Sequence, residues 1–190
     1  MNNLSSRPWG EVTDPTNHDP ESFRYLIHLD TGKRFILDEP GPDGLNDRYE
    51  YAIDDPGLLT EYGQLSTSLI DQQHTQIYWG TTSQHGYIVE VDADAIVAAS
   101  PRDMMLRARS LAEVLTVCPV LSADEILAAT ADYDHNEILV SPANLVIRAV
   151  FWANLQEGAE TDPPLSREYI QLAASRADLP FIELDLVRPD

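Results

Sequence analysis

The sequence predicts an α+β fold, and three observations support it. Short strand-like and helix-like runs follow one another without the regular strand–helix–strand order of a parallel α/β sheet. Several helix-like runs begin at a Ser or Pro start signal. Of the 190 residues, 43% are hydrophobic, so a core can be buried without a metal or disulfide. The polar, Pro-rich residues 1–21 are interpreted as an N-terminal arm, and residues 22–190 as a single domain.

The predicted strands are short apolar runs bounded by turn residues. In the first of them, Phe23 and Tyr25 lie on one face, while Arg24 and His28 lie on the other. Residues 96–99 are predicted to be either helical or extended. The other strand predictions cover residues 22–29, 34–37, 65–69, 87–91, 137–140, 145–152 and 181–187.

The predicted helices carry recognisable start and stop signals. A glycine follows each of the first two, and Pro101 lies at the N-terminus of the third. Ser122 and Glu125 have the spacing of a capping box, and Ser166 is an N-cap residue. The helices are predicted over residues 56–62, 71–79, 101–117, 122–131 and 166–176.

Composition narrows the classes of partner and compartment. The formal net charge of −20 makes nucleic acid and anionic membranes poor partners, and it favours a basic protein partner. No apolar run reaches the ~20 residues that span a bilayer. The N-terminus lacks the apolar segment of a Sec signal peptide. Because Cys118 is the single cysteine, no internal disulfide can form, and we expect a cytoplasmic protein or one exported by a signal-free route.

Three hydroxyl side chains mark the segment on which the functional prediction rests. Ser66, Thr67 and Ser68 lie between two leucines in the predicted strand 65–69. Such a tripeptide is common by itself. Its order along the chain is more specific, because Arg24 lies in an earlier predicted strand and Glu137 opens a later one.

This order resembles the ADP-ribosyltransferases of the cholera and pertussis toxin type, which carry Arg, Ser-Thr-Ser and Glu on successive strands. The resemblance covers residues 23–152. It implies a split central β-sheet with flanking helices and an NAD site in the cleft between the halves. It further implies a mono-ADP-ribosyltransferase, as in bacterial effectors and toxins, that transfers ADP-ribose to a protein or other macromolecular acceptor.

The residue types suit NAD cleavage. The bond between nicotinamide and ribose breaks through an oxocarbenium-like transition state, as in glycoside hydrolysis. Glu137 can stabilise that positive charge, and Arg24 can hold the pyrophosphate by paired hydrogen bonds. The hydroxyls of Ser66, Thr67 and Ser68 can hold the carboxylate and bond the ribose. The resemblance assigns the same roles.

One position departs from the family pattern. The family has Gln or Glu two residues before the catalytic Glu, where it orients the acceptor, and this chain has His135. Transfer to an acceptor becomes less secure, and hydrolysis by an NAD glycohydrolase becomes an alternative. A non-catalytic acidic binding module with the same fold is a second alternative.

Other candidates keep two interpretations each. His28 is either structural or an equivalent of the histidine in the diphtheria-like branch of these toxins. Tyr78, Trp79 and Tyr87 either pack in the core or stack on nicotinamide. The five histidines show no metal-ligand spacing, so no metal site is predicted.

Overall fold

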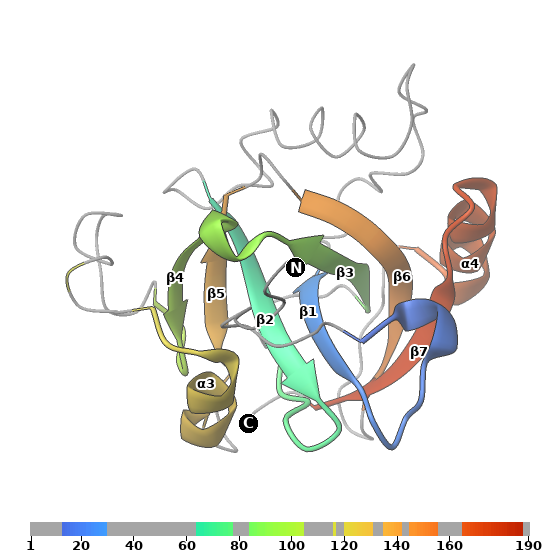
Figure 1. The fold of residues 1–190 in the computed structure, drawn as a ribbon. Helices are drawn as coiled ribbons and strands as arrows, with labels where there is room; N and C mark the ends of the chain where they lie inside the picture. Colours follow the sequence, from blue (N-terminus) through green and yellow to red (C-terminus); the bar gives the residue numbers. More distant parts are fainter. Residues whose placement is uncertain are drawn as a thin grey trace, which may run out of the picture.

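The computed structural model describes residues 13–29, 64–77, 84–104, 116, 120–130, 135–141, 145–155 and 165–187. These residues form a mixed α/β fold around one curved sheet (Figure 1). None of the described helices is long and apolar enough to span a membrane.

Seven strands make the sheet, in the order β4-β5-β2-β1-β3-β6-β7, and every neighbouring pair except β6–β7 is antiparallel. The strands are β1 (Arg24–Leu29), β2 (Leu65–Asp71), β3 (His85–Val91), β4 (Ile96–Ser100), β5 (Glu137–Val140), β6 (Leu145–Leu155) and β7 (Phe181–Leu186). The described helices are α3 (Ala123–Ala129), α4 (Arg167–Arg176) and the 3-10 turns η1 (Pro15–Asn17) and η3 (Ala93–Ala95).

Most of the predicted elements are confirmed within a few residues. Residues 96–99 are extended and belong to β4. The capping box at α3 is present, because the Ser122 side chain accepts from the Glu125 amide and the Glu125 side chain accepts from the Ser122 amide. The Ser166 hydroxyl caps α4 by accepting from the amide of Tyr169. Local capping chemistry therefore fixes where both helices begin.

The helix predicted over residues 71–79 is wrong. Strand β2 continues to Asp71, whose carboxylate accepts from the amides of Gln73 and His74 and contacts the His74 ring. Asp side chains favour such turns because they bond backbone amides that a helix would use. After the turn, Gln76 forms an isolated bridge with Val187.

Several predictions fall outside the described residues. These are the return strand 34–37, the helix 56–62, Tyr78, Trp79 and Cys118. Of the helix predicted over 101–117, residues 101–104 form an irregular turn, and the rest apart from Thr116 lies outside the described residues.

Apolar side chains form a separate cluster on each face of the sheet. One cluster takes alternate residues of β1 and β3 such as Leu26 and Tyr87, and both α3 and α4 pack on it. The other contains Tyr25, Ile88 and Phe151. Because successive strand residues point to opposite faces, β1 and β3 contribute to both clusters.

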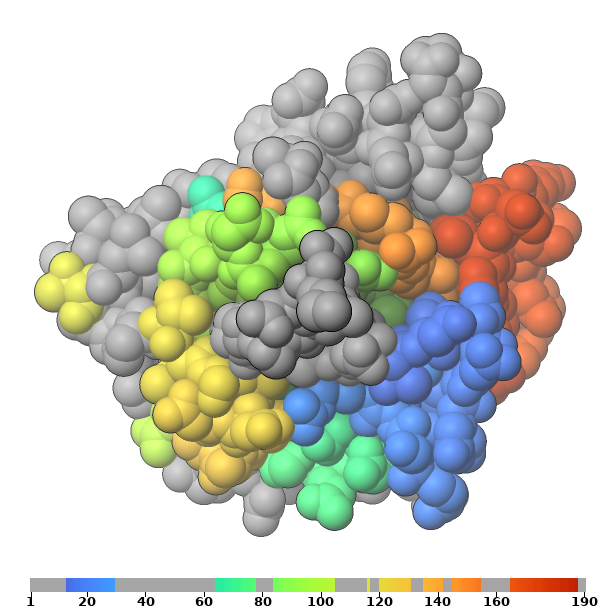
Figure 2. All heavy atoms as spheres, viewed as in Figure 1, coloured from blue at the N-terminus to red at the C-terminus, as the bar shows by residue number. Residues whose placement is uncertain are grey.

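The N-terminal residues 13–21 lie along the sheet. The amide of Thr13 donates to the carbonyl of Arg24, and the Arg24 amide donates to the Thr13 hydroxyl. His18 bonds the Tyr25 hydroxyl at 2.9 Å. In Figure 2 this segment, in blue, lies beside the C-terminal residues in red.

Pairing within the sheet changes partner in the middle of β2. Residues Leu65 to Thr67 pair with β5, whereas Ser68 to Asp71 pair with β1. The β1–β2 ladder therefore ends at the pair Ile27–Ser68, and beyond it His28 pairs with β3 alone. The sheet is continuous through β2, but its two halves part there, beside the hydroxyl segment.

Candidate functional site

A partly buried hydrogen bond joins the hydroxyl segment to the predicted catalytic carboxylate. The Ser66 hydroxyl on β2 donates to Oε1 of Glu137 on β5 at 2.7 Å. The two residues are 71 positions apart in the sequence and are brought together because β2 and β5 are neighbours. Glu137 is 4% exposed, so its carboxylate is held in a fixed place inside the protein.

The turn that follows β4 supplies the second donor to this carboxylate. Ser100, the last residue of β4, lies opposite Glu137 in the register. The chain then turns back, and the amide of Met104 donates to Glu137 Oε2 at 2.7 Å. One carboxylate oxygen therefore accepts from the strand residue Ser66, and the other from Met104 in the turn after β4.

Burial governs the protonation of this group. Desolvation raises the pKa of Glu137 above its ordinary value of 4.5, and the bonds from Ser66 and Met104 oppose that rise. The negative charge of Asp103 and a hydrogen bond with it raise the pKa further. Glu137 is thus a buried carboxyl with Asp103 as an acidic neighbour, and both features raise its pKa.

Asn136 fastens β2 to the start of β5. Continuing the β2–β5 register would place it opposite Leu69. Its side-chain Oδ1 accepts from the Leu69 amide at 2.7 Å, and its Nδ2 donates to the Leu69 carbonyl at 2.8 Å. The amide side chain thus replaces a backbone pair of the ladder and fixes the strand that carries Ser66 against the residue before Glu137.

The other two hydroxyls of the segment also bond to β5 or the residue before it. Thr67 donates to the carbonyl of Ile138 at 2.8 Å, and Ser68 donates to the carbonyl of Asn136 at 3.0 Å. Both side chains are buried. In this structure they hold strands together, so Ser66 is the hydroxyl that contacts the carboxylate.

His28 lies on the other side of Ser66. Its Nδ1 is 2.8 Å from the Ser66 carbonyl oxygen, at the place where the β1–β2 ladder has ended. A carbonyl only accepts, so Nδ1 carries the proton. His28, Ser66 and Glu137 thus form consecutive contacts across β1, β2 and β5.

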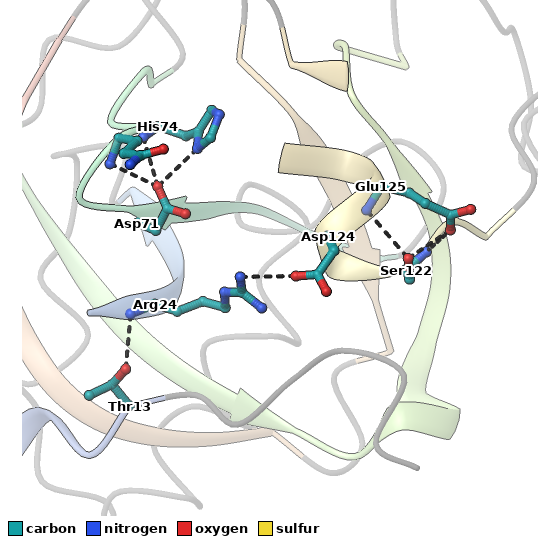
Figure 3. Close-up of polar contacts among 8 residues, drawn as sticks. Thr13, Arg24, Asp71, His74, Ser122, Asp124 and Glu125 are labelled. Atoms are coloured by element: carbon teal, nitrogen blue, oxygen red, sulfur yellow. Dashed lines mark hydrogen bonds and ion pairs between the residues drawn. The ribbon is translucent and has the colours of Figure 1, made fainter. Parts of the chain in front are cut away.

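Arg24 is not brought to this group. It lies at the opposite end of β1, with Asp71 as its register partner. Its guanidinium pairs with the carboxylate of Asp124 on α3 at 3.0 Å, as Figure 3 shows. Since the Asp124 side chain is 83% exposed, this is a surface ion pair between β1 and α3.

His135 lies near Asp103 rather than at the surface. Its Nε2 is 4.0 Å from Asp103 Oδ2, and its side chain is 9% exposed. The turn after β4 therefore brings a carboxylate both to Glu137 and to the residue two positions before it.

The remaining candidates lie elsewhere. Tyr87 is fully buried in the apolar cluster with Leu26. Among the described residues, no group of three or more His, Cys, Asp or Glu side chains is arranged to hold a metal ion. An open hollow of about 450 Å³ is lined by residues of η1, α4 and the start of β7, and contains none of the predicted site residues.

Three contributors escaped the sequence analysis: Asp103, Met104 and Asn136. Met104 acts through its backbone amide, which no residue type reveals. Asn136 precedes Glu137 at the start of a predicted strand, and that position was the one signal available in the sequence.

Comparison with known proteins adds no relative: no family model, curated protein or solved structure matches this chain. The chemistry of the site therefore stands on its geometry. A buried carboxylate held by a hydroxyl and an amide, next to an imidazole with a fixed tautomer, can stabilise a developing positive charge and bond sugar hydroxyls.

Proposed function

We propose that the protein cleaves NAD at the nicotinamide–ribose bond, as an ADP-ribosyltransferase. The observation that carries the proposal is the 2.7 Å bond from Ser66 to the buried carboxylate of Glu137, with His28 bonded to the Ser66 carbonyl. These three residues come from three adjacent strands, and each has a side chain suited to the ribose or the departing nicotinamide.

In this proposal Glu137 faces the oxocarbenium-like ribose. Its two bound donors leave lone pairs on both oxygens, since an ionised carboxylate offers about four acceptor positions. Ser66 holds the carboxylate so that no reorganisation is needed when charge develops. The division of the sheet at β2 supports the split-sheet cleft that the resemblance implies.

His28 takes the cofactor-binding place on β1 that the sequence analysis gave to Arg24. It lies beside Ser66, whereas Arg24 is paired with Asp124 on the surface. The proposal is therefore closer to the histidine-bearing, diphtheria-like branch than to the arginine-bearing one.

Hydrolysis of NAD is the second candidate. The specific observation in its favour is His135, because its side chain is 9% exposed and is turned toward Asp103. A buried imidazole does not present a surface to which a macromolecular acceptor docks. Water reaches such a place more easily than a protein side chain does.

Incubation of the full chain with NAD labelled in the adenosine half tests both candidates. Release of nicotinamide with label on an added protein extract indicates transfer, and release with free ADP-ribose alone indicates hydrolysis. Glu137→Gln is the matched control in both assays. If the wild-type chain releases no nicotinamide, the NAD proposal is wrong and the acidic binding module becomes the better hypothesis.

A further inference from the structure

A nucleophile that attacks the ribose must lose a proton, and Glu137 is not free to take it. Under the proposed function its carboxylate stays ionised to stabilise the ribose cation, and Ser66 and Met104 hold it in that role. The resemblance has a carboxylate or amide two residues earlier, but His135 occupies that position. A second base must come from another part of the chain.

The turn after β4 brings a second carboxylate, that of Asp103, close to Glu137. Ser100 lies opposite Glu137, the Arg102 amide donates to the Ser100 hydroxyl at 3.2 Å, and Met104 returns to Glu137. Asp103 lies between these two anchor points. The bonds on either side therefore hold its backbone close to Glu137.

One distance shows where this carboxylate lies: Asp103 Oδ2 is 4.0 Å from His135 Nε2. The next residue, Met104, bonds Glu137 through its amide, which keeps Asp103 close to that group. The Asp103 side chain is 14% exposed, so it is largely shielded yet reachable by water. The His135 imidazole faces this carboxylate and can orient it.

We propose that Asp103 is the general base for the nucleophile and that His135 is a positioning residue that orients its carboxylate. This inference rests on the proposed function and deepens it. The chain has no carboxylate two residues before Glu137. Asp103, in the turn after the neighbouring strand β4, supplies one instead, and His135 orients it.

The step balances without an oxidant or a metal. The glycosidic C–N bond of NAD breaks, and its electron pair leaves with neutral nicotinamide. A water oxygen forms the new bond to the ribose C1′, and one water proton passes to Asp103. The products are nicotinamide, ADP-ribose and a proton, which Asp103 later releases to solvent.

Azide rescue of Asp103→Asn tests the assignment. The variant is nearly isosteric and should lose about 10²–10⁴-fold in hydrolysis, the range expected for one acid–base group. Azide is already an anion and needs no base, so adding sodium azide should restore nicotinamide release and yield ADP-ribosyl azide, detected by mass spectrometry. Glu137→Gln should show no rescue, because bond breaking itself is lost.

The controls separate this inference from the proposed function. Asp94→Asn removes an exposed carboxylate on η3 and should hydrolyse NAD like the wild type. Wild-type rates in Asp103→Asn, or a slow variant that azide does not rescue, would overturn the role of Asp103 and leave NAD cleavage standing. A wild-type chain that releases no nicotinamide overturns both. If Asp103→Asn lacks a native melting transition, Asp103→Ser takes its place under the same criteria.

Discussion

The two halves of the sheet are held together by different forces. Around β2, the end of β4 and the start of β5, the buried side chains include six polar residues: Thr67, Ser68, Ser100, His135, Asn136 and Glu137. Among the described residues of β6 and β7, no polar side chain is buried, and Val150, Phe151 and Leu186 are fully enclosed. The region around Glu137 therefore relies on directional bonds, and the β6–β7 edge of the sheet on apolar burial.

The difference shows what each half can do. Apolar packing stabilises a fold roughly in proportion to the area removed from water, but it places no charge. Buried hydrogen bonds contribute less net stability, yet they fix donors and acceptors in single positions. We therefore expect core substitutions in the β6–β7 half to act on stability, and substitutions near Glu137 to act on chemistry.

Phe151→Ala should give the largest loss of stability. The ring is fully buried and crosses Gly86 on β3, where a Cβ atom would lie 2.9 Å from it. Truncating such a ring costs about 3–5 kcal/mol in the free energy of unfolding. Urea denaturation measures this, with the half-buried Val146→Ala on the same strand as control. A loss near that of the control would contradict the division between the halves.

Glu137→Gln should remove NAD cleavage without lowering the free energy of unfolding. The carboxamide oxygen can accept from the Met104 amide while its NH₂ donates to the Ser66 oxygen, so both bonds persist. The charge facing the ribose is lost, and we expect nicotinamide release to fall about 10²–10³-fold. A variant that melts below the wild type at pH 7 would show that the carboxylate is also a stabilising group.

The same pair of proteins gives a pH test. Folding raises the pKa of Glu137 above 4.5. Between pH 4.5 and the pKa in the folded protein, the native state therefore binds more protons than the unfolded state. The stability that the protonated carboxyl contributes is fully present below pH 4.5, and it is lost as the pH rises through the pKa of Glu137 in the folded protein. The stability of the wild type relative to Glu137→Gln should therefore fall with rising pH in that window. A difference that grows with pH would reverse the sign and refute the effect of burial.

Arg24→Lys should have the smallest effect. The Arg24–Asp124 pair is exposed, and such pairs contribute about 0–1 kcal/mol. We expect nearly unchanged unfolding and unchanged nicotinamide release. His28→Gln is the informative partner, and its rate of NAD cleavage should drop well below that of Arg24→Lys. Equal losses in both variants would return the cofactor role on β1 to the arginine.

Sequence periodicity and capping signals were sufficient for the described strands and for both capped helices, because alternation and capping are local. Ser66 and Glu137 were singled out by the order of residues along the chain and by the family resemblance, and the structure brings the two into contact. The helix predicted from the polar residues 71–77 was wrong, because the Asp71 carboxylate accepts from the amides of Gln73 and His74 and the chain forms a turn there.

The choice between Arg24 and His28 could not be made from the sequence. Both lie on the same face of one strand, and the answer depends on which end of β1 lies beside Ser66. That register is set by pairing between strands far apart in the chain. Asp103 and Met104 were missed for the same reason, because their roles follow from the path of a turn.

The two hydrogen bonds between the Asn136 side chain and Leu69 have a consequence for the order of folding. The side-chain bonds between β2 and the Asn136–Ile138 segment join residues 67 to 71 positions apart. Contacts of that separation carry a loop-closure cost that must be met before they form. A growing chain that ends before residue 136 has no carboxylate for the Ser66 hydroxyl to bond. We therefore expect the contact between Ser66 and Glu137 to form only when the fold is complete, so that under the proposed function no partly synthesised form of the protein cleaves NAD.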